Sequence, residues 1–117
     1  MSILSSTDTE PTSGLLKALA DDTRLRIVAL LAEGEVCVCH IAGALELTQP
    51  NVSQHLSVLR RVGVVASRRQ GNWIYCRLDL EDPTRAPIIN AVLGAFPEAS
   101  KRDRKRLAAR KKAQACE

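Results

Sequence analysis

A polar helix with clear ends is the feature that most narrows the folds open to this chain. Thr48 offers an N-cap oxygen, and Pro50 suits a first turn because its missing N–H costs nothing there. Gly63 is typical of the residue that follows a helix. The sequence therefore predicts a helix over residues 49–62, with an inward face of Val52, Leu56 and Leu59.

A β-hairpin is predicted directly after this helix. Val64 and Val65, and then residues 73–78, are rich in β-branched and aromatic side chains. They flank a Gln70-Gly71-Asn72 turn. A short helix over residues 36–45 and a tight turn precede the polar helix. The order indicates a helix-turn-helix followed by a hairpin wing.

The remaining pattern predicts a mainly α chain with a β-hairpin wing, an α+β fold class. Apolar residues at helical spacing predict further helices over residues 15–20, 25–31 and 84–96. A length of 117 residues suits one domain. We expect a loose segment at 1–13, a DNA-binding and dimerisation domain at 14–97 and a basic tail at 98–117. Since one small domain buries little surface, we expect a homodimer.

Charge is distributed unevenly along the chain. The net charge is +4. Residues 47–78 contain no Asp or Glu, yet they include Arg60, Arg61, Arg68, Arg69 and Arg77. Such a segment suits a polyanion, although an ordinary solvated basic face has the same composition. The tail over 101–112 carries eight cations against Asp103 alone, which fits either phosphate contacts or a solvated tail.

The polar face of the predicted helix over 49–62 suits the edges of bases and phosphates. Its side chains are short or carry amides, and none is acidic. Arginines near the helix end and on the hairpin suit phosphates or the minor groove, and a glycine at the tip permits close approach. The candidate contacts to double-stranded DNA are Gln49, Asn51, Ser53, Gln54, His55, Ser57, Arg60, Arg68, Arg69 and Gly71. For His55, an interfacial role within the protein is the alternative.

Hydropathy and the number of cysteines indicate the cellular compartment of the protein. No stretch approaches the roughly 18 apolar residues of a membrane helix, and the first residues lack a basic region of the signal-peptide kind. We therefore expect a cytoplasmic protein with no membrane partner. Thiols stay reduced there, so the four cysteines are read as ligands or core residues.

Two cysteines one residue apart form a candidate metal or metalloid site. Cys37 and Cys39 lie in "EVCVCHI" at the start of the predicted helix over 36–45. Residues two apart on an ideal helix point about 200° away from each other, so they do not share a face. Either one of the two is a core residue, or the first turn deforms to bring both sulfurs onto one ion. Two small buried hydrophobes are the plainer alternative.

At this point the sequence resembles the ArsR/SmtB family of winged-helix repressors. The matching stretches are "ALADDTRLRIVALLAEGEVCVCHIAGAL" and "LTQPNVSQHLSVLRRVGVVASRRQGNWIYCRL". "EVCVCHI" resembles "ELCVCDL" of the arsenic-responsive branch. The resemblance implies a homodimer, joined through its first and last helices, that represses its own operon. It also implies As(III) or Sb(III) as inducer on Cys37 and Cys39, with no organic cofactor.

The chain departs from that branch at two positions. Ala42 stands where the third clustered cysteine falls, so a third ligand is missing or comes from Cys116 or Cys76. His40 replaces the usual Asp, and His is a common Zn ligand. The last predicted helix lacks the His and Asp pattern of the zinc-sensing branch. The N-terminal segment lacks the cysteine of the cadmium and lead type.

Other functions fit the residues less well. A thiol-redox repressor, or a Cd- or Zn-sensing repressor, keeps the same fold with another signal. An enzyme is not expected, because the adjacent Cys39 and His40 do not easily pair as nucleophile and base. A protein-interaction module with a basic tail is a further alternative.

Overall fold

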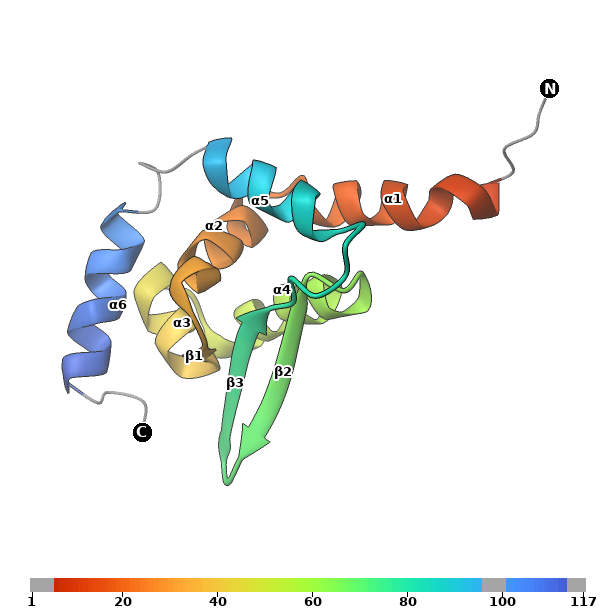
Figure 1. Ribbon diagram of the computed structural model, residues 1–117. Coiled ribbons are helices and arrows are strands. Elements are labelled where there is room, and N and C mark those ends of the chain that lie inside the picture. Colours follow the sequence, from red (N-terminus) through yellow and green to blue (C-terminus); the bar gives the residue numbers. More distant parts are fainter. Residues whose placement is uncertain (1–5, 96–100, 114–117) are drawn as a thin grey trace.

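The computed structural model describes residues 6–95 and 101–113 (Figure 1). Helices surround one hydrophobic core, and a β-hairpin projects from it. The elements in chain order are α1 (Ser6–Leu19), α2 (Asp22–Leu30), a 3-10 turn η1 (Leu31–Glu33), β1 (Val36–Cys37), α3 (Val38–Leu45), α4 (Gln49–Arg61), β2 (Val65–Gln70), β3 (Trp73–Leu78), α5 (Ala86–Ala95) and α6 (Lys101–Ala113). The predicted α+β class is confirmed.

The ends of α4 follow from its capping residues. The Thr48 side chain accepts a hydrogen bond from the Asn51 N–H at 3.3 Å, which satisfies one of the unpaired donors of the first turn. At the other end Gly63 has φ 82°, and the Val64 N–H donates to the Leu59 carbonyl at 2.9 Å. These local interactions explain why the sequence predicted α4 nearly to the residue.

The core holds α4 in place. Val52, Leu56 and Leu59 are fully buried, as predicted from their spacing. They pack in one cluster with Ile27 and Val28 of α2 and with residues of α3, β2 and β3. Burial of each aliphatic side chain contributes roughly 1.5–3 kcal/mol to the free energy of folding. The apolar face therefore fixes the orientation of the helix, and its polar side faces solvent.

A third strand is the main departure from the sequence prediction. Residues 36–45 were expected to form one helix, and that prediction is wrong at its start. Val36 and Cys37 form β1, which pairs antiparallel with β3 in the register Val36↔Cys76 and Cys37↔Tyr75. The sheet order is β1-β3-β2. The edge of β3 offers long-range backbone partners, and these override the local helical pattern.

The first helix is also longer than predicted. Residues 1–13 were expected to be loose and the helix to begin near Leu15, yet α1 begins at Ser6. Pro11 lies inside it and removes one backbone hydrogen bond. The Ser/Thr-rich composition misled the prediction. Residues 1–5 lie outside the described part.

The basic tail forms a docked helix rather than a separate segment. Leu107 of α6 is buried against the core, and α6 packs along α3. Asp103 is only 3% exposed and accepts two hydrogen bonds from Arg26 of α2, at 2.9 and 3.0 Å. Arg106 donates to Asp103 at 2.8 Å and also to the Ala44 carbonyl at the end of α3.

This cluster explains why a highly cationic helix stays on the protein. The carboxylate of Asp103 lies between two guanidinium groups, and its bonds raise the pKa of Arg26. Arg106 and Arg26 also satisfy carbonyls in the last turn of α3, at Ala44 and Leu45. Among the described helices, none has the length and apolar character needed to span a membrane.

Replacing Asp103 tests the docking of α6. Asp103→Ala leaves Arg26 and Arg106 without their shared acceptor, and we expect a loss of about 1–3 kcal/mol in the free energy of unfolding. Denaturant titration followed by circular dichroism measures it. Lys105→Ala, at an exposed position of the same helix, is the matched control and should change stability by less than about 0.5 kcal/mol. Equal stability of the two variants would contradict the docking role.

Candidate nucleic-acid interface and thiol site

The outward face of α4 is polar and accessible. The burial of Val52, Leu56 and Leu59 turns the other side of the helix to solvent. No residue of α4 is acidic, and its last turn carries Arg60 and Arg61. The exposed members of the predicted contact set on this helix are Gln49, Asn51, Ser53, Gln54, Ser57 and Arg60. The geometry therefore presents these predicted side chains together on one surface.

His55 lies apart from that surface. Its side chain is 22% exposed, and its Nδ1 lies 3.1 Å from an Arg24 nitrogen of α2. Arg24 also lies beside Asp21, the N-cap of α2, whose pKa is lowered by hydrogen bonds from the Arg24 backbone N–H and by the nearby charges. The structure thus brings His55 to the α2–α4 contact, the alternative that the sequence had left open.

The hairpin carries the remaining predicted contacts. Its strands pair from Val65↔Leu78 to Gln70↔Trp73, and Gly71 at the tip has φ 62°. The exposed Arg69 donates a hydrogen bond to the Gly71 carbonyl at 3.2 Å. A left-handed residue is needed for this tight turn, which accounts for the glycine.

Arg68 has a partner that the sequence did not reveal. It forms two hydrogen bonds with the Glu35 carboxylate, at 2.6 and 2.8 Å, and its guanidinium lies 4.6 Å from the centre of the Tyr75 ring. These bonds lower the pKa of Glu35. Since Glu35 directly precedes β1, the pair ties the wing to the cysteine segment. Only the β1–β3 register brings these residues together, so no local sequence signal would have found them.

The two cysteines lie at the junction of β1 and α3. Cys37 ends the strand with φ −68° and ψ 142° and is the N-cap residue of α3, whereas Cys39 is in its first turn. Because the backbone of Cys37 is extended, the 200° angle between residues two apart on a helix does not apply to the two cysteines. The two Sγ atoms are 3.5 Å apart. Two sulfurs on one tetrahedral ion, with metal–sulfur bonds of about 2.3 Å, lie about 3.8 Å apart, so the observed spacing suits a shared ion.

Within the described residues, no group of three His, Cys, Asp or Glu side chains is arranged to hold a metal ion. Cys76 is fully buried, opposite Val36 in the sheet, and its sulfur lies 3.3 Å from the Ser67 hydroxyl. Burial raises the pKa of the Cys76 thiol. These observations favour the core role for Cys76 that the sequence analysis had allowed.

His40 faces α6. Its buried Nε2 has no hydrogen-bond partner within the described part of the chain. Burial lowers the pKa of His40, and the cations Lys111 and Arg110 lower it further. The last turn of α6 therefore lies near His40 and the start of α3. Cys116, the other candidate third ligand, lies outside the described residues.

The Cys39 sulfur is in disulfide linkage, whereas Cys37 and Cys76 are thiols. A sulfur in a disulfide cannot act as a thiolate ligand, so the ligand pair is complete only in the reduced protein.

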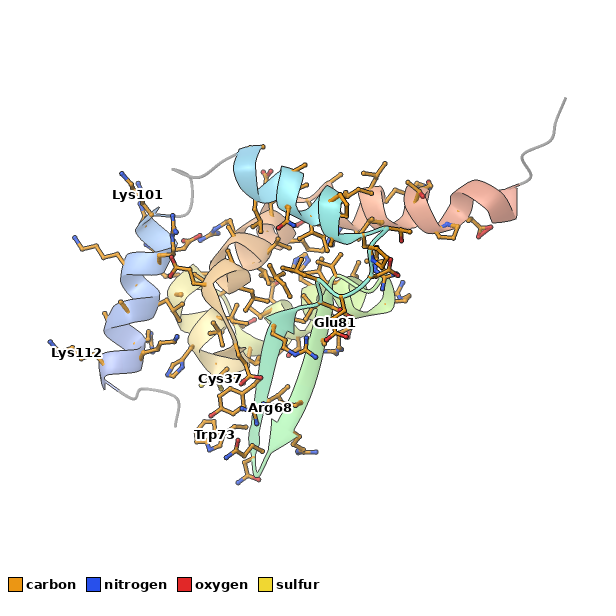
Figure 2. All side chains as sticks on the ribbon, in the orientation of Figure 1. Cys37, Arg68, Trp73, Glu81, Lys101 and Lys112 are labelled. Atoms are coloured by element: carbon orange, nitrogen blue, oxygen red, sulfur yellow. The ribbon has the colours of Figure 1, made fainter. Side chains whose placement is uncertain are left out.

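A cleft adjoins the two cysteines. Its volume is about 280 Å³, and its lining includes Cys37, Cys39, Gln49 and Ser53 of α4, and Trp73 and Ile74 of β3. Figure 2 shows Cys37, Arg68 and Trp73 close to one another where β1 meets the hairpin. The sulfur pair, the first turns of α4 and the wing therefore meet at one place.

Comparison with known proteins agrees with this arrangement. Residues 21–67 match the family model described as bacterial regulatory protein, arsR family. A homodimeric winged helix-turn-helix DNA-binding domain from Mycobacterium bovis, a possible ArsR-family regulator, is 30% identical with a TM-score of 0.69. This chain covers 93% of it, over 85% of its own length. The chain belongs to the arsR family. It is thus a regulatory protein and not an enzyme, as predicted.

Two regulators named for arsenic resistance are similar over shorter stretches. Arsenic resistance transcriptional regulator ArsR1 of Pseudomonas putida is 53% identical over 70 residues, which are 59% of this chain and 55% of that protein. The arsenical resistance operon repressor of Escherichia coli is 49% identical over 76 residues, 64% of this chain and 65% of that protein. The matches thus span less than two thirds of either relative.

Two further similar proteins are named for other elements. The cadmium resistance protein CadC of Listeria innocua is 43% identical over 73 residues, 62% of this chain and 61% of that protein. The structure of the antimony-specific repressor AntR is 30% identical, with a TM-score of 0.64, covering 86% of this chain and 90% of that one. The comparisons therefore leave the inducer of this chain open.

Thiol reactivity should separate Cys39 from the core cysteine Cys76. Because Cys76 is fully buried and its pKa is raised, we expect it to alkylate at least tenfold more slowly than the half-buried Cys39 in the reduced protein at pH 8. Peptide mapping by mass spectrometry after timed iodoacetamide treatment measures both rates. Denatured protein is the control in which the rates converge. Equal rates in the native protein would contradict the buried placement of Cys76.

Proposed function

We propose that this chain is a transcriptional repressor that binds double-stranded operator DNA as a homodimer and leaves it when As(III) or Sb(III) binds Cys37 and Cys39. The observation that carries the proposal is the 3.5 Å spacing of the two sulfurs at the junction of β1 and α3. One side of that junction is part of the wing sheet, and the other leads into the helix-turn-helix. The sulfurs are therefore attached to both DNA-reading elements.

The DNA-binding half of the proposal is supported by the exposed side chains. Gln49, Asn51, Ser53 and Gln54 stand on the first half of α4, which in a helix-turn-helix meets base edges. Ser57 and Arg60 follow near the end of the helix, and Arg69 and Gly71 lie on the hairpin, where phosphates or the minor groove would be within reach. His55 contributes by holding α4 on α2, and a contact of its own to DNA requires release from Arg24.

A homodimer through α1 and α5 is supported by the apolar surface that these helices present. Leu16 of α1 is 51% exposed, and Val92 and Leu93 of α5 are only half-buried. Both helices lie at the end of the molecule opposite the hairpin (Figure 1). Pairing there leaves both wings and both α4 helices of a dimer available to two half-sites.

Ligand binding would reach the DNA-binding surface by a short route. A metalloid that pulls Cys37 toward Cys39 acts on a strand of two residues paired with β3. It also displaces Glu35, which holds Arg68 of the wing. Since these elements pack as one unit, a shift at the sulfurs changes the relative position of wing and α4.

Inorganic arsenite needs a third ligand, for which we propose Cys116. Helix α6 ends at Ala113, and its last turn lies near His40, beside Cys39. Cys116 follows three residues after Ala113, and three residues span at most about 10 Å. Cys76 is less suitable because it is buried in the sheet.

A redox signal is the second candidate function. The disulfide at Cys39 favours it, because oxidation would remove one ligand and constrain the start of α3. A comparison of operator affinity in reduced and oxidised protein tests this candidate. A redox sensor releases DNA on oxidation without arsenite, whereas a metalloid sensor requires arsenite under reducing conditions.

Cysteine variants test the metalloid proposal. In a shift assay on the reduced protein bound to its own promoter, we expect arsenite to release the wild type, while Cys37→Ser and Cys39→Ser stay bound at concentrations at least tenfold higher. Cys76→Ala is the matched control and should release like the wild type. Parallel titrations with Sb(III), Cd(II) and Zn(II) identify the inducer class. Unchanged release of both serine variants would reject the sensing role.

The positive charge of Arg69 on the hairpin should affect how DNA binding depends on salt concentration. Arg69→Ala removes one proposed phosphate contact, so the slope of log K against log salt should fall by about 1. Glu35→Gln weakens the hold on Arg68 and should leave the slope unchanged or make it steeper. Fluorescence anisotropy over a salt series measures both. An unchanged slope for Arg69→Ala would place the wing away from the phosphates.

A further inference from the structure

We propose that the last turn of α6, with Arg110, Lys111 and Lys112, is a further DNA-contacting element that binds phosphates of the operator duplex beside α3. This inference rests on the proposed DNA-binding function and adds a surface to it, outside α4 and the wing. It is carried by the fixed position of α6 on α3, by the charge of that turn, and by the way a helix-turn-helix lies on DNA.

Helix α6 is held along α3 at a defined place. In its first half, Arg106 donates a hydrogen bond to the Ala44 carbonyl at the end of α3. Near its other end, the Arg110 side chain lies against Gly43, where an added Cβ would be only 2.6 Å from the Arg110 Nε. The close approach of the two helices thus depends on the missing side chain at Gly43. The last turn of α6 is therefore a fixed part of the surface.

This last turn is close to the part of α4 that would meet base edges. Arg110 and Lys111 lower the pKa of His40, because both cations lie near the first turn of α3. The adjacent Cys39 lines the same cleft as Gln49, the first residue of α4. In Figure 1 the last turn of α6 lies on the hairpin side of the molecule, whereas its first turn lies on the α5 side. The cationic turn thus adjoins the proposed DNA-binding surface.

The place beside α3 suits phosphates rather than bases. In a helix-turn-helix the second helix enters the major groove, while the first helix crosses the backbone of the duplex. Here α4 is the second helix and α3 is the first. An element packed on α3 therefore extends the part of the protein that lies on the backbone. Contacts to phosphates fix the position of a protein on DNA and carry no sequence information directly.

The cations of this turn are not used for ion pairs within the described part of the chain. All three side chains are exposed. Among the described residues, no carboxylate forms an ion pair with any of them, whereas Arg104 binds Glu33 and Arg106 binds Asp103. Asp103 is the only acid of α6, and it is buried. A DNA duplex carries one negative charge for each 1.7 Å of its axis, so it supplies the complementary charge.

Charge removal at the two ends of α6 tests the position of the contact. Lys111→Ala and Lys112→Ala should each lower the slope of log K against log salt by about 1, measured by fluorescence anisotropy on the promoter duplex. Arg102→Ala is the matched control, because it removes one charge from an exposed position about 15 Å away along the same helix. Its slope should stay at the wild-type value. An equal fall in all three variants, or in none, would overturn the inference.

A second pair of variants separates DNA contact from support of the helix. Cations in a last turn also stabilise a helix through its dipole. Lys112→Arg keeps the cation and should keep the wild-type slope, whereas Lys112→Gln should lower it by about 1 with the same helix content by circular dichroism. A purely structural role predicts the reverse, a loss of helix content in Lys112→Gln with an unchanged slope.

Duplexes with one neutral phosphate locate the contact. A methylphosphonate is placed at each position of the promoter duplex in turn, and each duplex is titrated with the wild type and with Lys112→Ala. At a contacted phosphate, neutralisation should weaken the wild type several-fold and the variant little, because both changes remove the same interaction. Additive effects at every position would contradict a direct contact.

Failure of this inference is distinguishable from failure of the proposed function. If Arg69→Ala lowers the salt slope and the lysine variants do not, α6 lies away from DNA and the proposed function stands. If the wild type shows no preference for its promoter over a scrambled duplex, the proposed function itself fails. If the lysine variants bind the duplex normally and lose binding to single-stranded RNA or to anionic vesicles, this turn serves another polyanion and the inference is overturned.

Discussion

The pairing of β1 with β3 is the interaction on which the rest of the site depends. A strand of only two residues, Val36 and Cys37, is held by the edge of the hairpin. This pairing delays the start of α3 to Val38 and leaves Cys37 extended. A residue that would have faced away from Cys39 on a helix is thereby placed beside it. The same register carries Glu35 to Arg68, so the sulfur pair and the wing are joined by covalent chain and by an ion pair.

The cationic side chains fall into two groups, those held in contacts within the protein and those that face solvent. Arg26 and Arg106 are used internally, where they hold Asp103 and the carbonyls at the end of α3. By contrast, the exposed Lys112 extends away from the core on α6 (Figure 2). Composition alone cannot separate these groups, because a cation in a structural ion pair and a cation for a phosphate look identical in a sequence. Fixing α6 on α3 also places Arg110 and Lys111 of α6 near His40, the residue after Cys39.

In the proposed function, the cleft brings the ligand site and the DNA-binding residues into a small volume. Here Cys37, Gln49 and Trp73 line one cleft. A ligand on the sulfurs would therefore act on the DNA-binding residues without a long pathway. It would favour the DNA-free conformation if it makes better contacts with that conformation than with the DNA-bound one.

The sequence by itself determined the elements with strong local signals. Thr48, Pro50 and Gly63 fixed α4, the turn at Gly71 fixed the hairpin, and apolar spacing gave the core face of α4. The exposed polar contact set and the cysteine pair were also evident, because they depend on residue type and spacing.

Only the tertiary structure decided how the two sulfurs are arranged. The strand at Val36–Cys37, the Glu35–Arg68 pair, the position of His55 on α2 and the docking of α6 all require partners far away in the chain. Local propensities are worth tenths of a kcal/mol per residue, whereas long-range pairing and burial are worth more and override them. For that reason the sequence named the two sulfurs, and the fold set the distance between them.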